Sequence, residues 1–101
     1  MSSSSLEKYV NPGGLKEIDP KDPHVVFIGQ WAVKEYNRRS GKSLIFLSVV
    51  RGWIQVVEGF MYYLELLVDD GPNNPKKYGC KVWEKSWENF LDLLAFEEIY
   101  D

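Results

Sequence analysis

Few residues in this sequence are of types that perform covalent or metal chemistry. The 101 residues include one histidine, His24, and one cysteine, Cys80. A disulfide within the chain and a zinc cluster of cysteines and histidines each need more such residues, so both are excluded. A catalytic cysteine–histidine pair is also disfavoured, because each partner has a single candidate. We therefore expect a protein that is not an enzyme and that has no metal and no cofactor.

The other polar patterns favour structural interpretations. Gly41-Lys42-Ser43 is similar to the end of a phosphate-binding loop, but that motif needs a glycine five residues earlier, where Tyr36 stands. Gly41 fits a helix stop instead. We expect His24 to have a surface or capping role and Cys80 to be a small buried apolar residue. Paired acids are expected in solvent at Asp69-Asp70 and Glu97-Glu98, and packed aromatic rings at Tyr62, Tyr63, Trp83 and Phe90.

The composition is that of a single acidic globular domain. It is 45% hydrophobic and 27% charged, which argues against wholesale disorder. Twelve basic and fifteen acidic residues give a net charge of -3, so we expect no nucleic-acid partner. No apolar run reaches the roughly 20 residues that span a bilayer, and the first residues lack the apolar core of a signal peptide. We expect no membrane association and a cytoplasmic location, or a secreted protein if a leader has been removed.

Local signals predict one long helix. Asp22 can cap free backbone amides, and Pro23 suits the first helical position. Arg38-Arg39 followed by Gly41 indicates the helix end. The apolar residues that recur at helical spacing, and so form one face, are Val25, Ile28, Gly29, Ala32 and Tyr36. The pattern predicts a helix over residues 23–40.

After this helix the apolar pattern changes to a period of two, which is typical of strands. Residues 44–54 form one such segment, and residues 90–99 fit a strand or a helix. The positions expected to face the core are Phe60, Tyr62, Leu64, Leu66 and Val68, then Tyr78, Cys80 and Val82. A connection is expected at residues 84–88, an edge strand at 15–18 and a flexible tail at 1–12. A helix followed by antiparallel strands predicts an α+β domain over residues 13–101, with the helix on one face of a curved sheet.

Two of the expected connections contain apolar residues where a turn is normally polar. One is Gln55-Val56-Val57-Glu58-Gly59, and the other is Lys85-Ser86-Trp87-Glu88. Exposed apolar groups at loop tips commonly mark contact surfaces. The alternative is that Val56, Val57 and Trp87 fold back onto the core.

Several separated segments together carry a recognisable pattern. Gly13-Gly14 precedes the domain, Ile28-Gly29-Gln30-Trp31-Ala32-Val33-Lys34-Glu35-Tyr36-Asn37 lies in the helix, and residues 55–59 read Gln-x-Val-x-Gly. Downstream come Met61-Tyr62-Tyr63-Leu64, Lys81-Val82-Trp83-Glu84 and Trp87-Glu88-Asn89-Phe90. From about Gly13 to Phe96, the chain resembles the plant members of the cystatin family.

The resemblance implies both a fold and a function. Cystatins are reversible, tight-binding, competitive inhibitors of papain-like cysteine proteases, and their fold is one long helix cradled by a five-stranded antiparallel sheet. An N-terminal segment and two hairpin loops form a wedge that blocks the protease cleft. Carried over to this sequence, the wedge comprises Pro12, Gly13, Gly14, Gln55, Val56, Val57, Glu58, Gly59, Ser86 and Trp87.

Two wedge positions depart from the family pattern. Glu58 stands where the family usually has a small residue, and Ser86 stands where proline is common. A carboxylate carried into a cleft must be solvated, paired or directed outward. Directed into the enzyme, Glu58 would weaken binding by roughly 1–3 kcal/mol, and directed outward it would only tune the choice of protease. The alternative function is therefore a non-inhibitory interaction or storage module of the same fold, with an impaired first loop.

The oligomeric state also bears on the function. Long strands joined by a tight loop can open and exchange between two copies of a chain. Such a swap through residues 55–59 would straighten the loop and remove half of the wedge. We therefore expect the monomer to be the active form and a domain-swapped dimer to be inactive.

Overall fold

The helix α2 spans Pro23–Ser40 in the computed structural model, as the sequence predicts. Asp22 Oδ1 accepts hydrogen bonds from the backbone amides of His24 at 2.8 Å and Val25 at 3.3 Å. Gly41 adopts a left-handed conformation with φ of 78°, and its amide donates to the carbonyl four residues earlier at 2.9 Å. Asp22 therefore caps the start of the helix and Gly41 ends it, as predicted.

The structure describes residues 14–100. Outside this range lie the predicted tail over residues 1–12 and two predicted wedge residues, Pro12 and Gly13. Among the described residues, none of the helices combines the length and the apolar character needed to cross a membrane.

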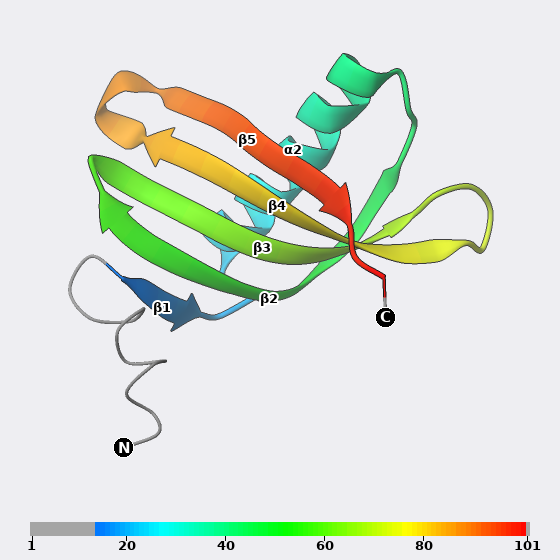
Figure 1. Ribbon diagram of the computed structural model, residues 1–101, viewed down its shortest axis with the longest axis horizontal. Helices are drawn as coiled ribbons and strands as arrows, with labels where there is room; N and C mark the ends of the chain where they lie inside the picture. Colours follow the sequence, from blue (N-terminus) through cyan, green and yellow to red (C-terminus); the bar gives the residue numbers. More distant parts are fainter. Residues whose placement is uncertain (1–13, 101) are drawn as a thin grey trace.

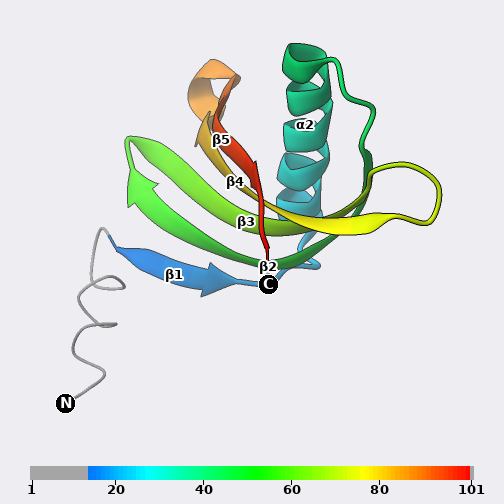
Figure 2. The same cartoon turned by 45° about the vertical axis from the view of Figure 1, so that its right-hand side comes forward.

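The described strands form one antiparallel sheet in the order β1-β2-β3-β4-β5, so each lies beside its sequence neighbours (Figure 1). Their bounds are β1 Leu15–Ile18, β2 Ile45–Val57, β3 Gly59–Asp69, β4 Pro75–Lys85 and β5 Phe90–Glu98, with a short 3-10 turn η1 at Ser86–Glu88. The sheet is curved, and α2 lies on its concave side (Figure 2). The predicted α+β fold and the predicted edge strand are confirmed.

The core lies between α2 and the inner face of the sheet. Its buried hydrophobic residues are Val25, Ile28, Ala32 and Val33 on α2, Leu44 just before β2, and Val49, Tyr62, Leu64, Leu66, Val68, Tyr78, Cys80, Val82 and Leu93 on the strands. Each large aliphatic side chain buried in this way contributes about 1.5–3 kcal/mol. The alternation predicted for β3 and β4 is confirmed except at Phe60, which is 40% exposed because it stands beside the β2–β3 turn.

Several predicted strand ends are wrong. β2 continues to Val57 and β3 begins at Gly59, so residues 55–57 are paired strand residues and Glu58 alone makes the turn. β4 likewise includes Glu84 and Lys85, which the sequence places in a connection. Residues 90–98, which the sequence leaves open as a strand or a helix, form a strand. The reason is the same in all three cases. Pairing with a neighbouring strand decides the structure, and the partner strand lies outside the local sequence pattern.

Asn37 fastens the end of α2 to the start of the sheet. Its Nδ2 donates to the Leu44 carbonyl and its Oδ1 accepts from the Leu44 amide, both at 3.0 Å. Leu44 is 3% exposed, so these bonds satisfy two backbone groups at a residue that is packed into the core. These two hydrogen bonds give a structural role to the asparagine of the helix signature.

Asn37→Ala is expected to lower the free energy of unfolding by about 1–3 kcal/mol, because the Leu44 backbone groups lose their partners. Urea unfolding followed by circular dichroism measures the change. The matched control is Asn74→Ala, which removes a hydrogen bond to the Asp70 carbonyl in an exposed turn. Equal losses in the two variants would contradict the role assigned to Asn37.

Candidate functional site

The described parts of the predicted wedge lie at one end of the sheet (Figure 1). Gly14 directly precedes β1, and β1 pairs with β2 so that Leu15 lies opposite Gln55. The β2–β3 turn and the β4–β5 turn lie at this same end, because these consecutive strands run antiparallel. The structure therefore brings Gly14, residues 55–59 and Ser86-Trp87 together.

The first hairpin closes through a very tight turn. Val57 and Gly59 are in register across β2 and β3, with Glu58 alone between them. Gly59 has φ of 90°, a left-handed conformation that residues with side chains rarely adopt. A Cβ built on Gly59 would also collide with the carbonyl oxygen of Glu84 on β4. Glycine is thus required here both by its own backbone and by the adjacent strand.

Gln55 supports this hairpin from its strands. Its Oε1 accepts a hydrogen bond from Tyr63 Oη on β3, at 3.1 Å. Beyond it, Val56 is 63% exposed and Val57 is 38% exposed. The tip therefore presents apolar side chains to solvent, and the alternative in which the two valines fold back onto the core is wrong.

The second hairpin turns through η1 and presents Trp87. Asn89 adopts φ of 52°, and its amide donates to the Ser86 carbonyl at 3.1 Å, which closes the turn without the proline common in the family. Trp87 is 61% exposed. A large apolar side chain kept in solvent gives up favourable burial, so its exposure is typical of a contact residue.

Trp83 joins the two hairpins. Its indole Nε1 donates to the carbonyl of Glu58, at the tip of the first hairpin, at 2.8 Å. Its ring meets the Phe90 ring edge-on at 5.4 Å, and the Lys85 ammonium lies 4.8 Å and 4.6 Å from these two ring centroids. A cation placed against aromatic faces adds roughly 0.5–1 kcal/mol at a partly exposed site. The tip of the first hairpin is therefore held by the base of the second.

Trp83→Phe is expected to weaken any binding that uses both tips by about 2- to 10-fold. The variant keeps an aromatic ring beside Lys85 and Phe90 but loses the hydrogen bond to Glu58, which contributes about 0.5–1.5 kcal/mol. The inhibition constant against papain measures the effect. Tyr63→Phe, which removes the hydroxyl bonded to Gln55 beneath the tip, is the matched control, and a larger loss in that variant would contradict the tether.

This end of the sheet offers apolar surface rather than reactive groups. Its exposed apolar side chains are Val56, Val57, Phe60 and Trp87. Cys80 is buried in the core as predicted, and burial raises the pKa of its thiol to about 12, so the thiol is protonated at neutral pH. Across residues 14–100, no three His, Cys, Asp or Glu side chains are grouped to hold a metal ion. The geometry suits binding by shape and apolar contact.

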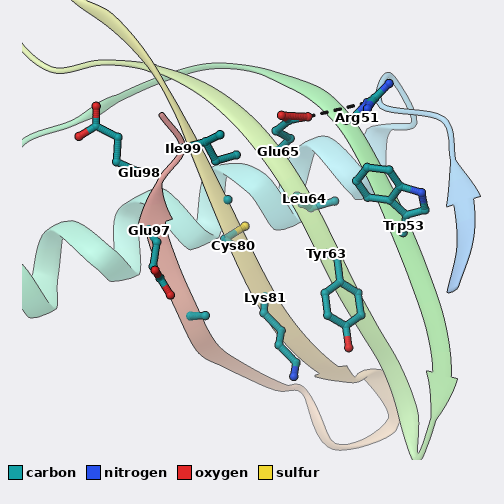
Figure 3. Close-up of a pocket in the computed structure, with 12 residues that line it drawn as sticks. Arg51, Trp53, Tyr63, Leu64, Glu65, Cys80, Lys81, Glu97, Glu98 and Ile99 are labelled. Atoms are coloured by element: carbon teal, nitrogen blue, oxygen red, sulfur yellow. Dashed lines mark ion pairs between the residues drawn. The ribbon is translucent and has the colours of Figure 1, made fainter. Parts of the chain in front are cut away.

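A separate hollow of about 600 Å³ lies on the sheet face away from α2 (Figure 3). Its walls include Trp53 and Tyr63, with the Lys81 ammonium 5.4 Å from the Tyr63 ring centroid. Arg51 and Glu65 form an ion pair at its rim, at 3.8 Å. Since none of the described wedge residues lines this hollow, it is distinct from the site at the hairpin ends.

Comparison with known proteins relates this arrangement to a family. The sequence model of the SQAPI family, described as "Aspartic acid proteinase inhibitor", matches residues 16–99. "Cysteine proteinase inhibitor 5" of Arabidopsis thaliana is 47% identical over 86 residues, which are 84% of this chain and 70% of that protein. The chain belongs to the plant cystatins. "Cystatin-1" of Zea mays is 39% identical to this cystatin over 89 residues, 86% of this chain and 65% of that protein.

Solved structures agree with the fold of this cystatin. The salivary cystatin of the soft tick Ornithodoros moubata aligns with a TM-score of 0.78 at 15% identity, over 88% of this chain and 99% of that chain. The resemblance found in the sequence is therefore confirmed, together with the fold that it implies. The Arabidopsis relative is named as a cysteine proteinase inhibitor, and the prediction that the chain is not an enzyme is confirmed by its family.

Sequence reasoning missed residues on which the hairpins of this cystatin depend. The sequence predicts only packing for Trp83, yet its indole also donates a hydrogen bond to the Glu58 carbonyl. His24 is half-exposed, but its ring binds the carboxylate of Glu84 rather than serving only as a surface or capping residue. A signal was present, because continuing the inward alternation of β4 past Val82 places Glu84 on the helix side of the sheet.

Proposed function

We propose that this cystatin is a reversible, tight-binding, competitive inhibitor of papain-like cysteine proteases. The two hairpin tips and the N-terminal segment enter the active-site cleft and occlude it. The N-terminal part includes Gly14, together with Pro12 and Gly13 outside the described residues. The name of the Arabidopsis relative, a cysteine proteinase inhibitor, supports this class of target.

The observation that carries the proposal is a pair of exposed apolar tips that are tied together. Val56 and Trp87 are each more than 60% exposed, and the Trp83–Glu58 hydrogen bond links their hairpins. Rigid tips lose less conformational entropy on binding than mobile ones. Tryptophan is a leading hot-spot residue, and a plug of this kind needs no nucleophile of its own.

Titration of active papain with the purified monomer tests the proposal. Inhibition that is micromolar or tighter, overcome by substrate and reversed by dilution, is expected. Folded monomer that does not inhibit would contradict the proposal. Size-exclusion fractions are assayed separately, and an equally active dimer would contradict the expectation that only the monomer inhibits.

A second candidate function is inhibition of aspartic proteinases. The family model that matches residues 16–99 is described by that activity. Pepsin assayed with the same preparation distinguishes the two candidates. Inhibition of pepsin without inhibition of papain would replace the first proposal by the second.

Glu58→Ala is expected to tighten papain inhibition by about tenfold or more, since the variant removes an exposed carboxylate from the tip that enters the cleft. The measurement is the inhibition constant of the variant beside that of Glu97→Ala. This control removes the same charge from an exposed position near the far end of β5. An unchanged constant would mean that the carboxylate stays in solvent, and rescue of an inactive parent chain would support the non-inhibitory module with an impaired first loop.

A further inference from the structure

Glu84 lies where the second hairpin extends beyond the end of β3. It is the last residue of β4 paired with β3, where it lies opposite Phe60. The next residue, Lys85, is paired with Phe90 of β5, and the turn follows. The direction of the second hairpin relative to the rest of the sheet is therefore set at Glu84.

The Glu84 side chain is an acidic group packed against the first turn of the helix. The residue is 8% exposed. His24 Nε2 lies 2.9 Å from each carboxylate oxygen, and Tyr62 Oη donates to Oε1 at 3.0 Å. A buried carboxylate is costly unless it is paired and hydrogen-bonded. These contacts therefore hold Glu84 in one place.

The two partners of Glu84 are themselves fixed. His24 is the second residue of α2, its backbone amide donates to the cap Asp22, and its ring stacks on Phe27 with centroids 5.8 Å apart. Tyr62 is 4% exposed in the middle strand of the sheet. Burial, with the nearby charge of Glu84, raises the pKa of the Tyr62 hydroxyl, so it remains a donor. The helix and the sheet thus converge on one carboxylate.

The backbone around Glu84 contacts the first hairpin as well. The Glu84 carbonyl lies where a side chain on Gly59 would fall. The preceding residue, Trp83, holds the Glu58 carbonyl through its indole. A displacement of Glu84 would therefore redirect Trp87 and at the same time disturb the tip of the first hairpin.

We propose that Glu84 is a positioning residue for both hairpins and that His24 and Tyr62 hold it against the first turn of α2. The relevance to inhibition rests on the proposed function, in which the two hairpins bind the protease. The positioning itself is a property of the free chain, so it can be measured without a protease.

Fluorine NMR of the chain labelled with 5-fluorotryptophan measures the positioning directly. The four tryptophans give four signals, and single phenylalanine variants assign those of Trp83 and Trp87. Glu84→Gln and His24→Ala are expected to shift or broaden both signals. His24→Ala is included as a second variant because it changes the partner and leaves Glu84 itself in place, at a side chain that is half-exposed. Unchanged signals in the folded variants would overturn the proposal.

A matched control is available on the same helix. Glu35 is held by Arg38 and Arg39 near the other end of α2, away from the hairpins. Glu35→Gln removes a comparably paired carboxylate and is expected to leave the signals of Trp83 and Trp87 unchanged. Equal perturbation by Glu35→Gln and Glu84→Gln would mean a general loss of stability and would overturn a specific role for Glu84.

Papain provides the second readout. Glu84→Gln and His24→Ala are expected to raise the dissociation rate of the complex about tenfold, with a smaller effect on association. His24→Gln, whose amide can donate to the carboxylate, is expected to recover most of the loss, which a purely structural role of the ring would not explain. A parent chain that does not inhibit papain would contradict only the proposed function, because the fluorine experiment still decides the positioning.

Discussion

Gly59→Ala is expected to lower the free energy of unfolding by about 2–5 kcal/mol and to weaken papain inhibition by at least about tenfold beyond the loss of folded chain. Two effects add at this position. A left-handed backbone costs a residue with a side chain about 1–2 kcal/mol, and overpacking costs roughly 1–3 kcal/mol more. The added methyl group would push the first hairpin away from the Glu84 carbonyl, and the distance between the two tips would change.

Gly41→Ala separates these two effects. Gly41 also has a left-handed backbone, but a Cβ added there meets nothing within 4 Å. Its substitution is expected to cost about 1–2 kcal/mol and to leave the inhibition constant of the folded protein unchanged. Urea unfolding and papain titration of both variants give the comparison. Similar inhibition constants for Gly59→Ala and Gly41→Ala would show that contact between the hairpins does not matter for binding.

Trp87→Ala is expected to raise the inhibition constant against papain by about 30-fold or more, which corresponds to the roughly 2 kcal/mol of a hot-spot residue. Stability is expected to change by no more than about 0.5 kcal/mol, because the side chain is 61% exposed and contributes little to the core. The effect is expected mainly in the dissociation rate of the complex, measured by dilution of preformed inhibitor–papain mixtures.

Tyr100→Ala is the control for loss of an exposed ring. Tyr100 is 81% exposed and follows β5, whose start carries the second hairpin and whose end lies away from it. Its substitution is expected to leave inhibition unchanged, and Trp87→Phe is expected to retain part of the affinity. If Trp87→Ala inhibited papain as well as the parent chain does, the second hairpin would have to be removed from the proposed wedge.

The parts of the fold that could be predicted from the sequence are those with local causes. Asp22, Pro23 and Gly41 act on backbone groups within a few residues of themselves, so the helix bounds follow from their order along the chain. The inner face of β3 follows from an alternation that each segment carries by itself. Residues 90–98 could not be assigned to a strand in this way, because their pairing partner β4 lies outside the segment.

The candidate site also combines residues that local sequence patterns predict with contacts that they do not. Val56 and Trp87 could be selected because apolar residues at expected turns are unusual, and both are exposed. The tether from Trp83 to Glu58 and the bond from His24 to Glu84 join residues 25 and 60 positions apart in the sequence. No local pattern specifies such contacts, since they depend on how the hairpins and the helix pack.

The strand order also predicts which strand of the sheet opens first. β2 to β5 are joined in succession by short turns, whereas β1 reaches β2 only after the whole of α2 has been traversed. Closing that longer loop costs more entropy, and β1 has only four residues with which to offset it. Amide hydrogens on β1 should therefore exchange before those of the hairpins, because local opening begins where the fewest contacts must break. Under the proposed function, a protease would contact the two preformed hairpin tips first, and β1 would be fixed against β2 last.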